Sequence, residues 1–324
     1  MLIRPRRLRR NTVLRNMVQE TRVSAQALIL PVFIMEGENI CEPIESLEGH
    51  NYYSYDTVYK VIEEAMELGV YSFMLFGIPK EKDPFGKEAY GEHSVIQKAT
   101  RYLKQQYSGI QIITDVCMCE YTSHGHCGII KGDSVDNDTT LSYLARIAVS
   151  HAKAGADMVA PSDMMDGRVE VIRKALDENG FSHIPIMSYS AKYSSSFYGP
   201  FRTVAKSAPS FGDRKTYQMD YHNSREAIKE AQLDIIEGAD IVMVKPALSY
   251  LDVIKMVKEN VNCPVCAYSV SGEYAMIKAG AKAGFIDEHG VMCETTVSIF
   301  RAGADILITY YALDIARAIL KGEL

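Results

Sequence analysis

The sequence predicts an α/β protein: a single (β/α)8 TIM barrel preceded by an extended N-terminal arm. Short apolar runs rich in β-branched residues alternate with amphipathic segments, which is the pattern of a parallel sheet covered by helices. The 324 residues suffice for one barrel of about 250 residues with extensions. No low-complexity linker divides the chain, so we expect an arm over residues 1–22 and one barrel domain over residues 23–324.

Eight apolar runs have the length and composition of buried strands, and helical patterns lie between them. The expected strands are Ala27–Met35, Ser72–Ile78, Gln111–Cys117, Asp157–Ser162, Pro185–Tyr189, Asp240–Lys245, Pro264–Val270 and Asp305–Tyr311. The clearest expected helices are Tyr55–Leu68, Ser142–Ala154, Arg225–Glu237 and Tyr250–Asn260.

A short internal repeat marks three joints between a helix and the next strand. Gly-Ala-Asp occurs at residues 155–157, 238–240 and 303–305, each time after a helical pattern and before an apolar run. Glycine adopts the left-handed conformation that ends a helix without steric cost. The repeat therefore favours a barrel built from similar αβ units.

Charge and hydropathy exclude several classes of protein. The net charge is −6, so no overall basic field favours nucleic acid. No run approaches the 18 or so apolar residues of a membrane span, and we expect a soluble, cytoplasmic protein. The N-terminal arm is a basic exception, and we expect it to pair with acidic surface on a neighbouring subunit. The arginines in its first fifteen residues are Arg4, Arg6, Arg7, Arg9, Arg10 and Arg15.

Three of the seven cysteines lie within eleven positions of one another and indicate a metal site. Cys117, Cys119 and Cys127 can meet at one zinc ion if the chain loops back, which Gly125 and Gly128 permit. Three thiolates would leave a fourth position for water or substrate, as in catalytic zinc sites. The spacing is also compatible with a closed structural site completed by His124 or His126, or with buried core thiols.

Two lysines follow or end apolar runs. Lys192 follows the fifth run and Lys245 ends the sixth. Burial or a neighbouring positive charge lowers the pKa of an amine, and the neutral amine attacks ketones to form a Schiff base. For either lysine alone, the more ordinary explanation is a side chain that reaches solvent or pairs with Asp115 or Asp163. However, the carboxyl ends of barrel strands form the active face, and several reactive residues fall there. These are Cys117, Lys192, Lys245, Ser271 and Tyr310.

The longest irregular stretch, Ser190–Gln218, is rich in Ser, Gly, Pro and Tyr and suggests an active-site lid. Arg202 and Arg214 could bind a carboxylate there through their planar guanidinium groups, with Lys215 and Gln218 nearby. Exposed loop arginines are more often simply solvated, so this pattern alone is weak.

Taken together, these motifs resemble those of the porphobilinogen synthase (5-aminolevulinate dehydratase) family, over nearly the whole chain. The cysteine motif lies in the stretch from Asp115 to Gly128. The others are Met-Ser-Tyr-Ser-Ala-Lys-Tyr (187–193), Phe-Tyr-Gly-Pro-Phe-Arg (197–202), Phe-Gly-Asp-Arg-Lys-Thr-Tyr-Gln (211–218), Met-Val-Lys-Pro-Ala (243–247) and Val-Ser-Gly-Glu (270–273).

The resemblance implies an enzyme that condenses two molecules of 5-aminolevulinate into porphobilinogen through lysine Schiff bases and zinc. It implies that Lys245 holds the substrate that supplies the propionate arm and Lys192 the one that supplies the acetate arm. Asp115 is implied as an acid/base or amine partner. Ser271 and Tyr310 would bind the first carboxylate. Arg202, Arg214 and Gln218 would bind the second, and Cys117, Cys119 and Cys127 the catalytic zinc.

The resemblance also implies a homo-octamer built from dimers that exchange arms, and an activating magnesium bound by Glu230 at a subunit interface. Some family members have a second zinc site formed by a histidine and a cysteine. Here His126 is present, but Thr216 stands where that cysteine would fall, so we expect no second zinc.

Two other hypotheses remain. A Schiff-base aldolase on the same barrel would need one lysine and no zinc, which leaves the cysteine cluster unexplained. A non-catalytic, zinc-stabilised scaffold would need a closed metal site and would form no imine with a ketone substrate.

Overall fold

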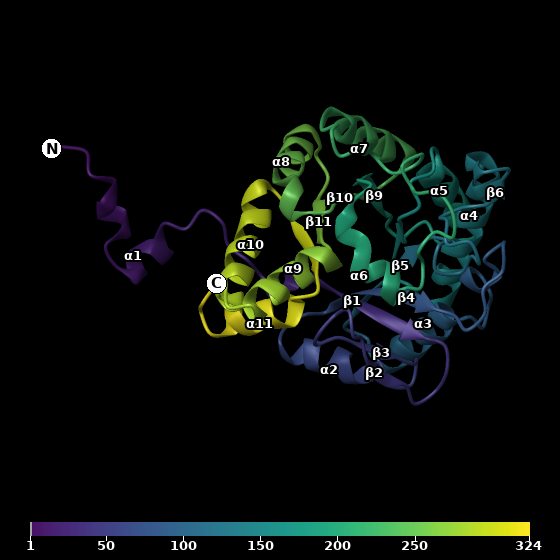
Figure 1. Ribbon diagram of the computed structural model, residues 1–324, viewed down its shortest axis with the longest axis horizontal. Helices are drawn as coiled ribbons and strands as arrows, with labels where there is room; N and C mark the ends of the chain where they lie inside the picture. The colour runs from purple at the N-terminus through teal and green to yellow at the C-terminus, as the bar shows by residue number, and fades with distance from the viewer. Residues whose placement is uncertain (1) are drawn as a thin grey trace.

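A computed structural model describes residues 2–324 and contains a barrel of eight parallel strands (Figure 1). Hydrogen-bonded pairs connect the strands in the order β8-β5-β4-β1-β12-β11-β10-β9. A bridge between Val159 and Ile186 brings the two ends of this order together. The barrel strands are β1 (Leu28–Met35), β4 (Ser72–Ile78), β5 (Gln111–Val116), β8 (Met158–Pro161), β9 (Met187–Lys192), β10 (Ile241–Lys245), β11 (Val265–Ser269) and β12 (Ile306–Thr309).

All eight predicted strands are present, because parallel strands buried on both faces form nearly continuous apolar runs. Their ends differ from the prediction by a few residues. One difference affects the site: Lys192 lies inside β9, not after it. Strand β9 extends beyond Tyr189 because Lys192 pairs with Lys245 at the end of β10.

An outer ring of helices surrounds the barrel. The predicted helix Tyr55–Leu68 begins later, at Tyr59, whereas the predicted helix Ser142–Ala154 begins earlier, after the N-cap Asp136. The ring comprises α2 (Tyr59–Glu67), α3 (Val95–Gln106), α4 (Asn137–Ala154), α5 (Arg168–Glu178), α7 (Arg225–Glu237), α8 (Leu251–Asn260), α10 (Glu288–Ala302) and α11 (Ala312–Leu320).

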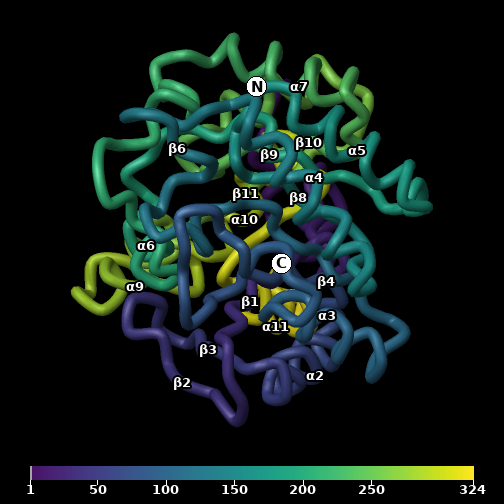
Figure 2. The backbone as a smooth tube through the Cα atoms, turned by 90° about the vertical axis from the view of Figure 1, so that its right-hand side faces the viewer, coloured from purple at the N-terminus to yellow at the C-terminus, as the bar shows by residue number. Residues whose placement is uncertain are grey.

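Further elements lie outside the eight strands and the eight helices of the ring. Helix α9 (Ser271–Lys282) contacts α6 (Gly199–Val204), and both lie on the same side of the molecule in Figure 2. Two antiparallel hairpins are formed by β2 (Cys41–Pro43) with β3 (Asn51–Tyr53), and by β6 (Ile130–Lys131) with β7 (Ser134–Val135). Single 3-10 turns are η1 (Pro5–Arg9), η2 (Ala25–Ala27), η3 (Lys87–Ala89), η4 (Ser196–Tyr198) and η5 (Leu248–Tyr250).

The Gly-Ala-Asp repeat joins helix to strand in two ways. Gly155, Gly238 and Gly303 end α4, α7 and α10 with φ of +101°, +109° and +119°, as glycine allows. The aspartates act on the neighbouring strand, a role that the sequence alone did not reveal. Each carboxylate accepts a backbone N–H within one residue of the start of that strand. The pairs are Asp157 with Ile112, Asp240 with Ile186, and Asp305 with Val265.

The N-terminal segment extends away from the barrel (Figure 1). It contains η1 and α1 (Thr12–Met17), and neither element has a buried residue. The predicted arm, residues 1–22, includes Met1, which lies outside the described residues. An exposed segment with seven arginines and several apolar side chains has the composition of a docking element.

The segment predicted as a long loop is only partly irregular. Residues up to Lys192 belong to β9, and η4 and α6 follow. Helix α6 is fixed to the barrel face because the Phe201 N–H donates to Ser271 Oγ at 2.9 Å. We call residues 197–218 the lid.

Across residues 2–324, none of the helices combines the length and the apolar character that crossing a membrane requires.

The aspartates of the repeat lead to a prediction about stability. Asp240→Ala leaves the Ile186 N–H without its acceptor, and we expect a loss of about 1–3 kcal/mol in the free energy of unfolding. Asp240→Asn keeps an acceptor oxygen and should lose less. Urea titration of both variants checks this, and equal stability of Asp240→Ala and wild type would contradict it.

Candidate active site

The predicted site residues gather at one end of the barrel. Lys192 and Lys245 are direct register partners at the ends of β9 and β10, so both amines emerge at the same level. Tyr310 follows β12, and its hydroxyl lies 3.3 Å from the hydroxyl of Tyr268 on β11. The structure therefore brings together residues separated by more than one hundred positions in the sequence.

A register shift sets the direction of Lys192. Ser188 pairs with Val242 and Ala191 pairs with Val244, so β9 has one residue more than β10 between these pairs. Side chains alternate along a strand, and an extra residue reverses the alternation. Tyr189 and Lys192, three positions apart, can therefore both face the site.

Lys245 is buried in a cage of aromatic rings. Its Nζ lies 4.1 Å from the ring centre of Tyr268, and 5.0, 5.2 and 5.3 Å from those of Tyr189, Phe201 and Tyr198. Burial, and after it the positive charge of Lys192, lowers the pKa of Lys245 to about 7. A large fraction of this amine is therefore neutral and nucleophilic near neutral pH.

Lys192 has a more polar environment. Its Nζ donates to the carbonyl oxygen of Ser162, and it lies 5.4 Å from the ring centre of Tyr189. The Ser162 hydroxyl donates to Asp115 Oδ2 at 3.1 Å. Burial, followed by the neighbouring Glu120, raises the pKa of Asp115 well above its usual range. Asp115 is thus linked to Lys192 through Ser162, and its role as an acid/base or amine partner stays a prediction.

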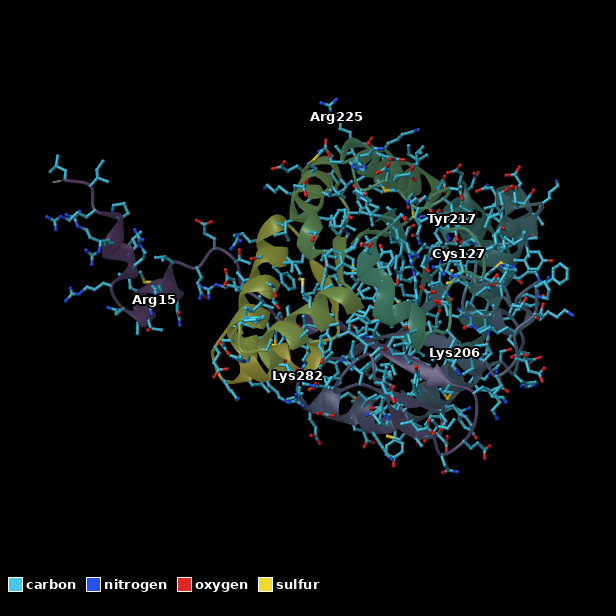
Figure 3. All side chains as sticks on the ribbon, viewed as in Figure 1. Arg15, Cys127, Lys206, Tyr217, Arg225 and Lys282 are labelled. Carbon is cyan, nitrogen blue, oxygen red and sulfur yellow. The ribbon has the colours of Figure 1, made fainter. Side chains whose placement is uncertain are left out.

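The three cysteines of the motif meet in a buried cluster. The Sγ atoms of Cys117, Cys119 and Cys127 all lie within 4.8 Å of one another, and those of Cys117 and Cys119 are 3.4 Å apart. Thiolates bound to one tetrahedral zinc are separated by about 3.8 Å, so this arrangement fits the ion. Tyr217 of the lid packs against the cluster, and Figure 3 shows Tyr217 and Cys127 next to each other.

Both nearby histidines have partners outside the cluster. His126 Nδ1 lies 3.1 Å from the hydroxyl of Tyr217, and its Nε2 lies 3.0 Å from the carbonyl oxygen of Phe211. His124 Nε2 lies 3.3 Å from the carbonyl oxygen of Pro84. Among residues 2–324, the side-chain groups that could hold a metal include no histidine. This favours the open, three-thiolate site over the closed one.

The lid contains a cluster of two arginines and a glutamine, Arg202, Arg214 and Gln218. Arg214 is buried and donates to the carbonyl oxygens of Gly125 and Ser207, at 2.9 and 2.5 Å. Gln218 is also buried, and neither atom of its amide has a hydrogen-bond partner in the described part of the chain. Burial, followed by the charge of Arg214, lowers the pKa of Arg202. Within residues 2–324 neither guanidinium group forms a salt bridge with a carboxylate, which favours binding of an anion.

Several site residues escaped the sequence prediction. The sequence patterns did not predict the aromatic cage, which consists of Tyr189, Tyr198, Phe201 and Tyr268. The high tyrosine content, twenty residues with no tryptophan, was the signal that could have indicated it. Glu120 was also missed. It is buried, accepts from Cys119 Sγ at 3.2 Å, and burial raises its pKa to about 8.

Glu230 lies apart from these residues, on the outer helix α7. It is half-buried, and burial raises its pKa while the positive charge of Arg168 opposes that effect. Asp234 and Asp166 are close enough to raise the pKa further. This acidic environment is compatible with a bound cation, and the assignment of magnesium stays a prediction.

The low pKa of Lys245 predicts how its reactivity depends on pH. Only the neutral amine reacts, so labelling by acetic anhydride should rise through a midpoint of about pH 7 and then level off. Lys192→Met removes a neighbouring charge, and its midpoint should move to higher pH. Mass spectrometry of labelled peptides measures both curves, with exposed Lys174 as the internal reference. A midpoint unchanged by Lys192→Met would contradict coupling of the two amines.

Comparison with known proteins agrees with this geometry. The family model described as delta-aminolevulinic acid dehydratase matches residues 2–318. Relatives of that name from Methanothermus sociabilis and Archaeoglobus fulgidus are 52% and 53% identical, over 98% and 97% of this chain and 98% and 97% of theirs.

The structure is also similar to a solved one. The Toxoplasma gondii delta-aminolevulinic acid dehydratase (porphobilinogen synthase), crystallised with its reaction product porphobilinogen, has a TM-score of 0.96 and 43% identity, with 99% of this chain and 92% of that chain covered. Since the family model and these relatives match nearly the whole sequence, the chain belongs to the delta-aminolevulinic acid dehydratase family.

Proposed function

We propose that this protein condenses two molecules of 5-aminolevulinate into porphobilinogen with loss of two molecules of water. The observation that carries the proposal is the pair of buried lysines, Lys192 and Lys245, held side by side at the ends of adjacent strands. Two amines so placed can hold two ketone substrates within bonding distance of each other. The crystallised relative from Toxoplasma gondii holds porphobilinogen, which supports this substrate class.

Lys245 acts as the first nucleophile in the proposed mechanism. Its neutral amine adds to the ketone carbon of one substrate, and loss of water leaves an imine whose protonated form is a strong electron sink. The surrounding ring faces stabilise that cation, as they stabilise other cations within about 6 Å. Lys192 holds the second substrate in the same way.

Each substrate also has a carboxylate to bind. We assign the carboxylate of the substrate on Lys245 to Ser271 and Tyr310, which lie beyond the ends of β11 and β12. The carboxylate of the substrate on Lys192 is assigned to Arg202, Arg214 and Gln218 of the lid. Closure of the lid would exclude water from both imines.

Cys117, Cys119 and Cys127 would hold a zinc ion. Their sulfur ligands suit zinc better than magnesium, and their burial protects the thiolates from solvent. When bound, zinc would supply a Lewis acid at its open fourth position and lower the pKa of coordinated water. We assign proton transfer during formation of the second imine to Asp115 and Ser162, because both adjoin Lys192.

The arm and Glu230 suggest how copies of the chain assemble. We propose a homo-octamer in which the basic arm docks on a neighbouring subunit, because the arm's apolar and arginine side chains are exposed. Glu230 would bind an activating magnesium near the neighbour's arm. The half-buried carboxyl on α7 and its acidic neighbours support this assignment.

The central experiment follows porphobilinogen formation and borohydride-trapped adducts together. We expect Lys245→Ala, or removal of metal by a chelator, to abolish product formation, and peptide mapping of the wild type to show an adduct on Lys245. Lys282 is exposed, and the control variant Lys282→Ala should form product at the wild-type rate. A metal-replete wild type that forms no pyrrole would contradict the proposal; an adduct without product would favour an aldolase, and no adduct would favour a scaffold.

Glu230 provides a separate prediction. Added magnesium should raise the rate of product formation by the wild type but not by Glu230→Gln, because the amide has lost the charge that binds the cation. Glu237→Gln, two turns further along α7, is the matched control and should keep the magnesium response. An unchanged response in Glu230→Gln would remove this residue from the magnesium site.

A further inference from the structure

A buried ion pair lies behind β9, outside the barrel. Arg168, the first residue of α5, donates to both carboxylate oxygens of Asp234 on α7, at 3.2 Å each. Its Nε also lies 3.9 Å from Asp163 Oδ1. All three side chains are nearly inaccessible to solvent, at 3% or less exposed. Such a pair is weak evidence for stability, because desolvation offsets much of the attraction.

The same guanidinium contacts β9 where its register shifts. Arg168 Nη2 donates to Ser188 Oγ at 3.0 Å and to the carbonyl oxygen of Tyr189 at 3.2 Å. The Ser188 hydroxyl in turn donates to Asp234 Oδ2 at 2.7 Å. Arg168 therefore holds the beginning of the segment in which β9 has one residue more than β10.

That extra residue is what turns Lys192 into the site. Without it, strict alternation would place Tyr189 and Lys192 on opposite faces of β9. Arg168 is also connected to the Lys192 amine through residues 162 and 163. It contacts the Asp163 side chain, and the carbonyl oxygen of the preceding Ser162 accepts a hydrogen bond from Lys192 Nζ. Arg168 thus contacts both segments that determine where the Lys192 amine lies, through the Tyr189 carbonyl oxygen and the Asp163 side chain.

We propose that Arg168 is a positioning residue for Lys192, acting through the Tyr189 carbonyl and the Asp163 side chain. This inference rests on the proposed function, in which Lys192 forms a Schiff base. Arg168 itself lies behind the strand, on the side that faces α7, and does not contact the reacting groups.

Lys245 has different support, so the two lysines can be tested separately. The Glu273 carboxylate accepts the N–H groups of Ala247 and Leu248 at 3.2 and 2.8 Å, and that of Val270 at 2.9 Å. This clamp holds the turn that follows Lys245 and does not involve Arg168. Loss of Arg168 should therefore misplace Lys192 and leave Lys245 in position.

The test measures borohydride trapping of 5-aminolevulinate on each lysine of the zinc-replete enzyme, by quantitative peptide mapping. Arg168→Lys keeps the charge but cannot bridge Asp234, Ser188 and the Tyr189 carbonyl at once. We expect its rate of adduct formation on Lys192 to fall about tenfold, since small displacements strongly reduce reaction rates. The rate on Lys245 should stay within about twofold of the wild type, because its clamp is intact.

Two further variants keep the test decisive. Ser188→Ala removes one partner of the guanidinium and should shift the ratio of adducts in the same direction, even if Arg168→Lys fails to fold. Lys104→Gln breaks an ion pair with Asp157 at the other end of the barrel and should leave the ratio unchanged.

The possible outcomes separate this inference from the proposed function. The positioning role would be overturned if the rate of adduct formation fell equally on both lysines. It would also be overturned if the ratio of Lys192 to Lys245 adduct were unchanged in Arg168→Lys and Ser188→Ala. The ion pair would then be only structural. A wild type that forms no adduct on Lys192 or Lys245 would instead overturn the proposed function.

Discussion

The close approach of two buried amines is the constraint on which the rest of the structure depends. Lys192 and Lys245 are register partners and are both buried. In such a region burial and mutual repulsion disfavour the state in which both amines are charged. Burial, and after it the charge of Lys192, lowers the pKa of Lys245 to about 7, which makes this amine a nucleophile near neutral pH. Only a rigid scaffold can hold such a pair together, and a closed sheet of eight strands supplies that rigidity.

Much of the fold followed from the sequence because its signals are local. Strands buried on both faces produce apolar runs, and glycine is required where a helix ends in the left-handed conformation. The cysteine cluster could also be predicted, since its three members lie within one loop. The rule that strand carboxyl ends form the active face then placed Lys192, Lys245 and Tyr310 together.

The features that could not be predicted depend on contacts between distant segments. The register shift that turns Lys192 inward depends on how β9 pairs with β10, so it cannot be predicted from the sequence of β9 alone. Arg214 is held in its buried position by hydrogen bonds to two carbonyl oxygens, one in the cysteine loop and one in the lid. In the sequence it resembled an ordinary solvated arginine. The second role of the Gly-Ala-Asp repeat was hidden for the same reason, because each aspartate acts on another strand.

The surroundings of the two lysines differ in a way that suits two different tasks. Aromatic rings surround Lys245, so it can become neutral easily and still stabilise a cationic imine once one forms. A carbonyl oxygen and the Ser162–Asp115 pair adjoin Lys192, so protons can be exchanged there. Condensing two identical molecules into an asymmetric product requires that the two sites treat their substrates differently. The aromatic cage on one side and the polar network on the other provide that asymmetry before any substrate binds.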